Sequence, residues 1–304
     1  MNRTRKAWKR ASVVSVVSAV AALGLVGAAQ AQSGGELRAK HDSLKQQLAA
    51  SPFGRPLLLQ SNESAGEPHG DVYAVADHPF RAVGTALQRA EHWCDVLLLQ
   101  TNIKRCAPSG SPPSQSLQVA IARKSAQPAD GAFQVEFKYA VKSADADYLS
   151  VQMAAAAGPL GTSDYKLSME AVPIDPQHTF IHMSYSYATG VAARMATDAY
   201  LATAGRSKVG FSVVGRDDAG KPLYVDGIRG VAERNTMRYF LAIEAVLGTS
   251  SEPPEQQADK RLRAWFAATE RYPRQLHELS LDEYLAMKRR EVRTADTRTP
   301  PAPA

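Results

Sequence analysis

The sequence predicts an α+β fold in which an antiparallel sheet carries helices on one of its faces. Between Leu117 and Tyr187, apolar and polar residues alternate with a period of two, which is typical of strands with one buried face. The flanking segments instead have helical periodicity, and the one that ends at Gly248 is long and almost wholly apolar in its second half. Such a helix is expected to be buried, so we expect it to cover the apolar face of the sheet.

The segment before Leu117 predicts a leading helix, two extended pieces and a pair of helices. These elements are expected at residues 32–53, 57–61, 71–75, 79–90 and 93–99. The leading helix has a narrow apolar stripe of Leu37, Leu44 and Leu48. Pro79 favours the start of the next helix, because its fixed φ angle suits a first helical position.

The alternating region predicts five strands at hairpin spacing. They are expected at residues 117–121, 133–141, 149–153, 165–169 and 181–187. Polar residues occupy the opposite parity of the last strand, namely His182, Ser184 and Ser186. We therefore expect an antiparallel sheet that is covered on one side only.

Three further elements follow the fifth strand: a helix, a sixth strand and the long helix. They are expected at residues 190–205, 208–217 and 225–248, and the apolar parity of the sixth strand is Val209, Phe211 and Val213. In the C-terminal tail, Ser280 and Glu283 have the spacing of a helix capping box. The chain is expected to divide into a leader at 1–31, a leading helix at 32–53, a main domain at 54–248, a linker at 249–256, a helical tail at 257–293 and a disordered end at 294–304.

The first 31 residues have the three parts of a secretory signal peptide. Five basic residues precede an uncharged apolar run from Ala11 to about Gly27, and Ala29-Gln30-Ala31 fits a cleavage site. A retained membrane anchor is the alternative, but this run is rich in Ala, Ser and Gly and shorter than the roughly 20 apolar residues of a membrane span. We expect a protein exported to the periplasm.

Removal of the leader changes the charge of the chain. The full sequence has 36 Lys and Arg against 30 Asp and Glu, a net charge of +6, whereas 31 basic residues remain against the same 30 acidic ones after residue 31. Nucleic-acid binding requires a clustered excess of Lys and Arg. The exported chain is therefore expected to have no nucleic-acid partner.

Cys94 and Cys106 are the only two cysteines in the chain. In an oxidising compartment such a pair predicts one disulfide. Its spacing differs from the Cys-x-x-Cys arrangement that lowers a thiol pKa, and two thiolates cannot complete a tetrahedral zinc shell. We expect a structural bond that ties the helical pair to the segment that follows it.

Two stretches add a resemblance to this picture. GDVYAVADHPFRAVGTAL (70–87) is similar to the strand and helix that open domains of the START-like, helix-grip superfamily, and ERNTMRYFLAIEAVL (233–247) is similar to the helix that their sheet grips. The resemblance is topological, covers residues 57–247 and transfers no individual residue. It implies a sheet curled around the last long helix, with a cavity between them for a hydrophobic or lipid-like small molecule.

Six residues are candidates for ligand binding: Tyr139, Tyr165, Tyr185, Tyr187, Arg234 and Arg238. The tyrosines have the inward parity of the strands, and tyrosine gives a cavity an apolar wall with a polar tip. The two arginines lie four residues apart on the long helix, where they could meet an anionic headgroup or a carboxylate. Ordinary core tyrosines and a solvated or internally paired helix face remain the alternatives.

The sequence predicts no catalytic set, cofactor or metal site. Ser163 and Lys166 match Ser-x-x-Lys, but they lie at a strand start and lack the companion motifs of penicillin-binding enzymes. Ser212 lacks the spacing of a nucleophile elbow. His178 and His182 lie on one strand, about 13 Å apart, too far to share an ion.

The favoured function is that of an exported binding or transfer protein for a hydrophobic or lipid-like small molecule. An enzyme of the same architecture, with a cyclase-like or hydrolytic activity, is one alternative. The other is an envelope interaction protein that contacts the membrane or an envelope partner through its helical tail, suggested by the tail aromatics Trp265, Phe266, Tyr272 and Tyr284.

Overall fold

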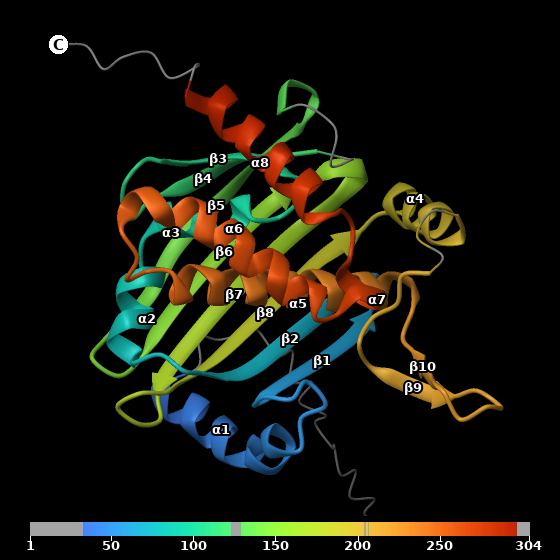
Figure 1. Cartoon of the computed structure of the whole chain (residues 1–304), viewed down its shortest axis with the longest axis horizontal. Helices are drawn as coiled ribbons and strands as arrows, with labels where there is room; N and C mark the ends of the chain where they lie inside the picture. The colour runs from blue at the N-terminus through green and yellow to red at the C-terminus, as the bar shows by residue number, and fades with distance from the viewer. Residues whose placement is uncertain (1–32, 123–128, 204, 206, 297–304) are drawn as a thin grey trace, which may run out of the picture. The chain divides into compact units, whose positions relative to one another are not determined.

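The computed structural model of the chain describes residues 33–122, 129–203, 205 and 207–296 (Figure 1). The expected signal peptide therefore lies outside the described residues, as does most of the C-terminal end expected at 294–304. Among the described helices, none is both long and apolar enough to cross a membrane.

Eight strands form one antiparallel sheet in the order β1-β2-β8-β7-β6-β5-β4-β3. They are β1 (Leu57–Ser64), β2 (Glu67–Ala76), β3 (Ile103–Ser109), β4 (Ser116–Ile121), β5 (Phe133–Ala144), β6 (Leu149–Ala157), β7 (Thr162–Pro173) and β8 (Thr179–Thr189). The predicted hairpin series is confirmed, since each of the strands from β3 to β8 pairs with the next. The pairing of β2 with β8 joins the first hairpin to this series.

The helices lie mainly on the inward face of the sheet, where α5 crosses it (Figure 1). They are α1 (Gly34–Ala49), α2 (Phe80–Leu87), α3 (Ala90–Leu98), α4 (Val191–Ala202), α5 (Gly227–Gly248), α6 (Pro254–Glu270), α7 (Pro273–Leu276) and α8 (Leu281–Asp296). The apolar second half of α5 is buried in the main core, as predicted, through residues such as Phe240, Leu241 and Ile243. The α+β, helix-grip fold class is confirmed.

Strand β3 was not predicted, because residues 103–109 were expected to form only a connection. Its sequence contains Lys104, Arg105 and Pro108. These residues interrupt the alternation of apolar and polar residues by which a strand is recognised. Charges and proline are nevertheless common in edge strands, and β3 lies at the edge of the sheet.

The predicted sixth strand is wrong for residues 208–212. Only Val213–Arg216 forms a strand, β9, and it pairs with β10 (Pro222–Tyr224) in a separate two-stranded sheet. The backbone N–H groups of Phe211 and Ser212 instead donate to the Glu233 carboxylate of α5, at 2.5 and 2.9 Å. A side chain on α5 thus takes the donors that a strand ladder would need.

The expectation of a sheet covered on one side only is also wrong. The predicted leading helix, α1, packs on the outward face, where its stripe of Leu37, Leu44 and Leu48 meets residues of β2, β7, β8 and the turn before β6. Those residues are Tyr73, Tyr148, Val172 and Phe180. Ser33 and Glu36 form a capping box that fixes the start of α1.

The C-terminal helices pack onto the main core. Trp265 of α6 and Tyr284 of α8 are 3% and 1% exposed. The capping box at Ser280 is confirmed by its hydrogen bonds with Glu283. Helix α6 begins at Pro254, inside the segment expected as a linker, so the connection after α5 is shorter than predicted.

The disulfide is present between Cys94 on α3 and Cys106 on β3. The Cα atoms of the two residues are 5.3 Å apart. The bond therefore ties the helical pair directly to the edge strand of the sheet, the structural role that the sequence predicts.

Candidate functional site

Three of the predicted tyrosines meet on the inward face of β7 and β8. The ring centroid of Tyr187 lies 5.4 Å from that of Tyr165 and 5.6 Å from that of Tyr185. Tyr239 of α5, which the sequence analysis did not single out, lies 5.2 Å from Tyr185. We call Tyr165, Tyr185, Tyr187 and Tyr239 the tyrosine cluster.

Strand parity places Tyr165 in this group. Tyr185 and Tyr187 share a face because they are two residues apart on one strand, and Tyr165 lies two residues before the inward-facing Leu167 on β7. The register with β8 shifts between Ser163 and Lys166, and Asp164 within this bulge has a φ of +52°. Beside the bulge, the Tyr165 ring stacks on that of Tyr187.

Helix α5 covers the tyrosine cluster incompletely. Tyr185 and Tyr187 are buried, whereas Tyr165, Tyr239 and the neighbouring Phe137 of β5 remain partly exposed although they lie on the inward side. Elsewhere in the same interface, Met183 and Met237 are fully buried. Solvent therefore reaches the aromatic part of the interface between the sheet and α5.

Tyr139 of β5 belongs to the same core but is not in ring contact with the cluster among the described contacts. It is 4% exposed, and its hydroxyl group has no hydrogen-bond partner. Burial raises the pKa of Tyr139, and that of Tyr185, Tyr187 and Tyr239, above the ordinary value. These hydroxyl groups therefore stay neutral at physiological pH.

The two predicted arginines are in different situations. Arg234 is 5% exposed, and its Nη1 atom is a second buried atom without a hydrogen-bond partner. Burial, together with the nearby charge of Arg238, lowers the pKa of Arg234 to about 10. Arg238 forms an ion pair with Glu278, which precedes α8, at 2.6 Å. The alternative of an internally paired helix face thus describes Arg238 but not Arg234.

A polar network on the outward face of the sheet was missed by the sequence analysis. His182 of β8 lies between two carboxylates, with its Nε2 atom 2.8 Å from Asp71 and its Nδ1 atom 3.2 Å from Glu170. The other oxygen of Asp71 lies 2.8 Å from Nε2 of His69, and Tyr148 donates to Glu170. The members come from three strands and the turn before β6, so only the strand register, which the sequence does not reveal, could have indicated this network.

This network does not have the geometry of a nucleophile with its base. Ser184 lies 3.5 Å from Nε2 of His69, but the same nitrogen faces Asp71 at 2.8 Å. A general base needs one nitrogen for the nucleophile and the other for the orienting acid. Among the described residues, no group of three or more His, Cys, Asp or Glu side chains is arranged to hold a metal ion.

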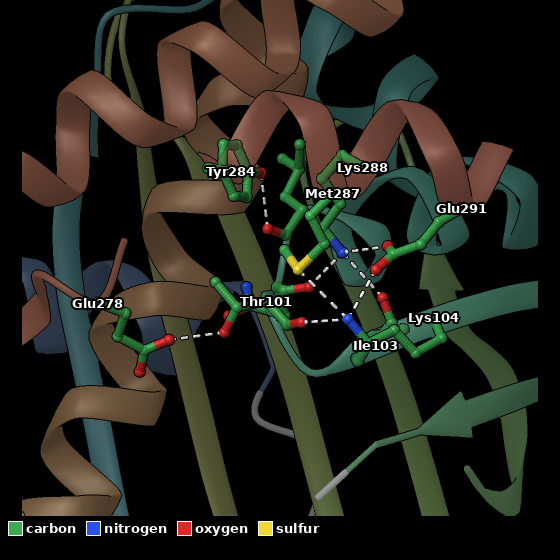
Figure 2. A network of polar contacts seen from close by, with 10 residues as sticks. Thr101, Ile103, Lys104, Glu278, Tyr284, Met287, Lys288 and Glu291 are labelled. Carbon is green, nitrogen blue, oxygen red and sulfur yellow. Dashed lines mark hydrogen bonds and ion pairs between the residues drawn. The ribbon is translucent and has the colours of Figure 1, made fainter. Parts of the chain in front are cut away.

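A second missed feature is a pair of buried lysines, Lys104 of β3 and Lys288 of α8, where α8 packs against β3 (Figure 2). Lys288 donates to the backbone oxygens of Gln100 and Ile103 and to Glu291, at 2.5, 2.9 and 2.9 Å. Burial lowers the pKa of Lys288 to about 8, as is common for catalytic lysines. However, an ammonium has three donors and all three are engaged within the chain, so we assign Lys288 a structural role.

An open pocket of about 630 Å³ lies beside α4. It is lined by the end of the β1–β2 hairpin, by Thr189 of β8 and by Arg194 of α4. Thr189 has the same parity on β8 as Tyr185 and Tyr187, so the pocket is on the same face of the sheet as the tyrosine cluster.

Comparisons with known proteins give only distant structural matches. No protein-family profile matches the chain, and no curated protein matches it. Among solved structures, a mutant norcoclaurine synthase from Thalictrum flavum, bound to a transition-state analogue, is 16% identical and covers 48% of this chain and 91% of its own, with a TM-score of 0.33. A conserved protein from Geobacillus kaustophilus is 10% identical and covers 60% of this chain and 96% of its own, with a TM-score of 0.36.

A third match, a conserved protein of unknown function from Enterococcus faecalis, covers the larger part of the chain. It is 7% identical and covers 86% of this chain and 99% of its own, with a TM-score of 0.31. At these identities and scores we base the fold class on the strand order and the position of α5 in this chain.

Proposed function

We propose that the protein is an exported binding or transfer protein of START-like type, which holds a hydrophobic or amphipathic small molecule between the inward face of the sheet and α5. The observation that carries this proposal is the tyrosine cluster, whose inward-facing rings of Tyr165 and Tyr239 remain partly exposed. An ordinary core closes over such rings, because burial of aromatic surface is favourable.

The chemistry of the site suits an amphipathic ligand. Ligand sites are mostly apolar and contain a few polar groups that fix the ligand's orientation. Here the rings supply the apolar wall, and the unpartnered hydroxyl of Tyr139 and guanidinium of Arg234 supply polar groups. The pocket beside α4 adjoins the strand that carries Tyr185 and Tyr187, since Thr189 of β8 lines it.

Titration with N-phenyl-1-naphthylamine, a neutral aromatic dye that fluoresces in apolar sites, tests the proposal. We expect saturable binding to one site. Replacement of both Tyr165 and Tyr239 by alanine should weaken it about tenfold, or about 1.4 kcal/mol. Because both rings pack against the main core, the double variant is compared at a temperature where urea denaturation shows it to be folded.

Tyr224→Ala on β10 is the matched control, because it removes a ring that packs with Arg274 outside the tyrosine cluster. It should leave the affinity for the dye unchanged. Absence of saturable binding to the unmodified protein would contradict the proposed function.

A further inference from the structure

We propose that the ligand of the tyrosine cluster is an amphipathic acid whose carboxylate or phosphate group binds the guanidinium of Arg234. This inference rests on the proposed function, because it requires a ligand between the sheet and α5. It adds the charge of that ligand and the residue that recognises it.

Arg234 is a buried cation with no direct ion pair among the described residues. It is 5% exposed, its Nη1 atom has no hydrogen-bond partner, and it forms no ion pair with any described residue. Buried charges in proteins are normally paired, because loss of hydration is costly. An arginine held in this way is suited to an anion from outside the chain, which it can bind with two parallel N–H donors.

The carboxylates around Arg234 are already engaged. Glu278 accepts from Nη2 of Arg238 and from Oγ1 of Thr101, both at 2.6 Å. Glu233, the residue before Arg234, accepts from Ser61 and from two backbone N–H groups of the loop before β9. Neither acid is free to act as the partner of Arg234.

The surroundings of Arg234 have an excess of positive charge. Lys208 is near both arginines, and burial together with their charges lowers its pKa. Arg234, Arg238 and Lys208 thus share Glu278 as their close carboxylate, while Glu270 lies 2.9 Å from His277. An anion placed at Arg234 would reduce this excess, whereas a neutral or cationic group would not.

Arg234 lies on α5, the helix that also carries Tyr239, and its positive charge opposes the rise in the pKa of Tyr187 that burial causes. The Tyr187 ring contacts those of Tyr165 and Tyr185. An apolar body that lies along the tyrosine rings therefore brings its polar end to Arg234. This juxtaposition of an aromatic wall and one buried cation selects a molecule with both an apolar body and an acid.

Two dyes of nearly identical shape test the inference. N-phenyl-1-naphthylamine is neutral, and 8-anilinonaphthalene-1-sulfonate has the same ring system with an anionic group. We expect the unmodified protein to bind the sulfonate about tenfold more tightly than the neutral dye. Competition by dodecanoate and by dodecyl phosphate then shows whether a carboxylate or a phosphate fits the site better.

Variants of Arg234 assign this preference to one residue. Arg234→Met should lower the affinity for the sulfonate about tenfold and change that for the neutral dye by less than about twofold. Arg234→Lys keeps the charge and should retain part of the preference. Arg263→Met is the matched control, since Arg263 is an exposed residue of α6 and its partner Asp259 keeps an ion pair with Arg289 at 2.6 Å.

Equal affinity of the unmodified protein for the two dyes would overturn the inference but leave the proposed function standing. The inference would also be overturned if Arg234→Met lost affinity for both dyes equally while its thermal unfolding midpoint was no lower than that of the unmodified protein. Failure of both dyes to bind would contradict the proposed function as well.

Discussion

Arg234 and Arg238 lie one helical turn apart on α5 and have opposite effects on the stability of the fold. Arg238 contributes an ion pair with Glu278 that links α5 to the segment before α8. Arg234 is buried without a partner, which costs free energy in the unliganded protein. A residue that lowers stability in this way is typical of a binding site rather than of a core.

Substitution of the two arginines by methionine should therefore change stability in opposite directions. Arg234→Met should raise the free energy of unfolding by about 1–4 kcal/mol, the range found when buried charges are replaced by apolar residues. Arg238→Met should lower it by about 1–3 kcal/mol, because Glu278 loses its cation. Urea denaturation of both variants measures the difference, and destabilisation by Arg234→Met would indicate a structural role for Arg234.

Part of the site could be predicted residue by residue. The parity of β7 and β8 was sufficient to group Tyr165, Tyr185 and Tyr187. Tyr239 could not be added, because its contact with Tyr185 depends on how α5 is rotated over the sheet. The difference between Arg234 and Arg238 could not be predicted either, since it depends on Glu278, forty residues further along the chain.

At the level of elements, α8 caps the end of α3 and the connection from α3 to β3. The last carbonyl groups of any helix lack partners within the helix. Here Tyr284 of α8 donates to the carbonyl of Leu99 at 2.8 Å, and Lys288 donates to those of Gln100 and Ile103 (Figure 2). The cation of Lys288 also complements the negative end of the α3 dipole. The C-terminal helix is therefore expected to stabilise the helical pair.

Lys288→Met should lower the free energy of unfolding by about 1–3 kcal/mol, the cost of leaving a buried polar group without its partner. The variant removes the lysine donor from the buried carbonyl groups of Gln100 and Ile103, although the Gln100 carbonyl keeps a bond from the backbone N–H of Ile103 at 3.3 Å. Arg289→Met, on the same helix, is a control for the loss of positive charge, because its partner Asp259 keeps an ion pair with Arg263. A change below about 0.5 kcal/mol in Lys288→Met, measured by urea denaturation, would mean that water replaces the lysine without cost.

The outward-face network predicts a pH dependence of stability that His182 controls. Burial alone would lower the pKa of His182, but the carboxylates of Asp71 and Glu170 raise it. In turn, the hydrogen bond from His182 helps to lower the pKa of Asp71. The stabilisation by His182 is thus complete below its ordinary pKa of 6.5 and is lost as the pH rises through its higher folded-state pKa. The part due to Asp71 is present above its ordinary pKa of 3.8 and is lost in acid.

His182→Gln should remove this dependence on the alkaline side. The ionisable side chains that face the network are His69, Tyr73 and Tyr148, with Lys40 of α1 above the Tyr73 ring. Urea denaturation at intervals between pH 5 and 9 should show a fall in stability for the unmodified protein, and a smaller fall for the variant. Parallel curves for the two proteins would contradict the assignment to His182.

The errors in the predicted elements have a common cause. A period of two identifies a strand with one buried face, so it found the five strands from β4 to β8 but not β3, an edge strand with charges and a proline. It also indicated a strand at residues 208–212, where the backbone instead bonds to Glu233. Local periodicity cannot reveal such a tertiary contact, nor the packing of α1 on the outward face.

For the whole molecule, the arrangement follows from a few patterns in the chain. Hairpin spacing determines the strand order from β3 to β8, and the apolar half of α5 determines which helix packs on the inward face. The same arrangement leaves the tyrosine cluster partly uncovered and buries Arg234 on α5, the helix that carries Tyr239. The central claim is that this interface holds an amphipathic molecule outside the cytoplasm.

Native mass spectrometry of the protein purified from a periplasmic fraction, followed by organic extraction and identification of bound molecules, tests this claim most directly. We predict a chain that begins at Gln32 and carries one small hydrophobic molecule with an acidic group, which is absent from Arg234→Met. An unliganded chain that also takes up no molecule when incubated with a lipid extract would contradict the account.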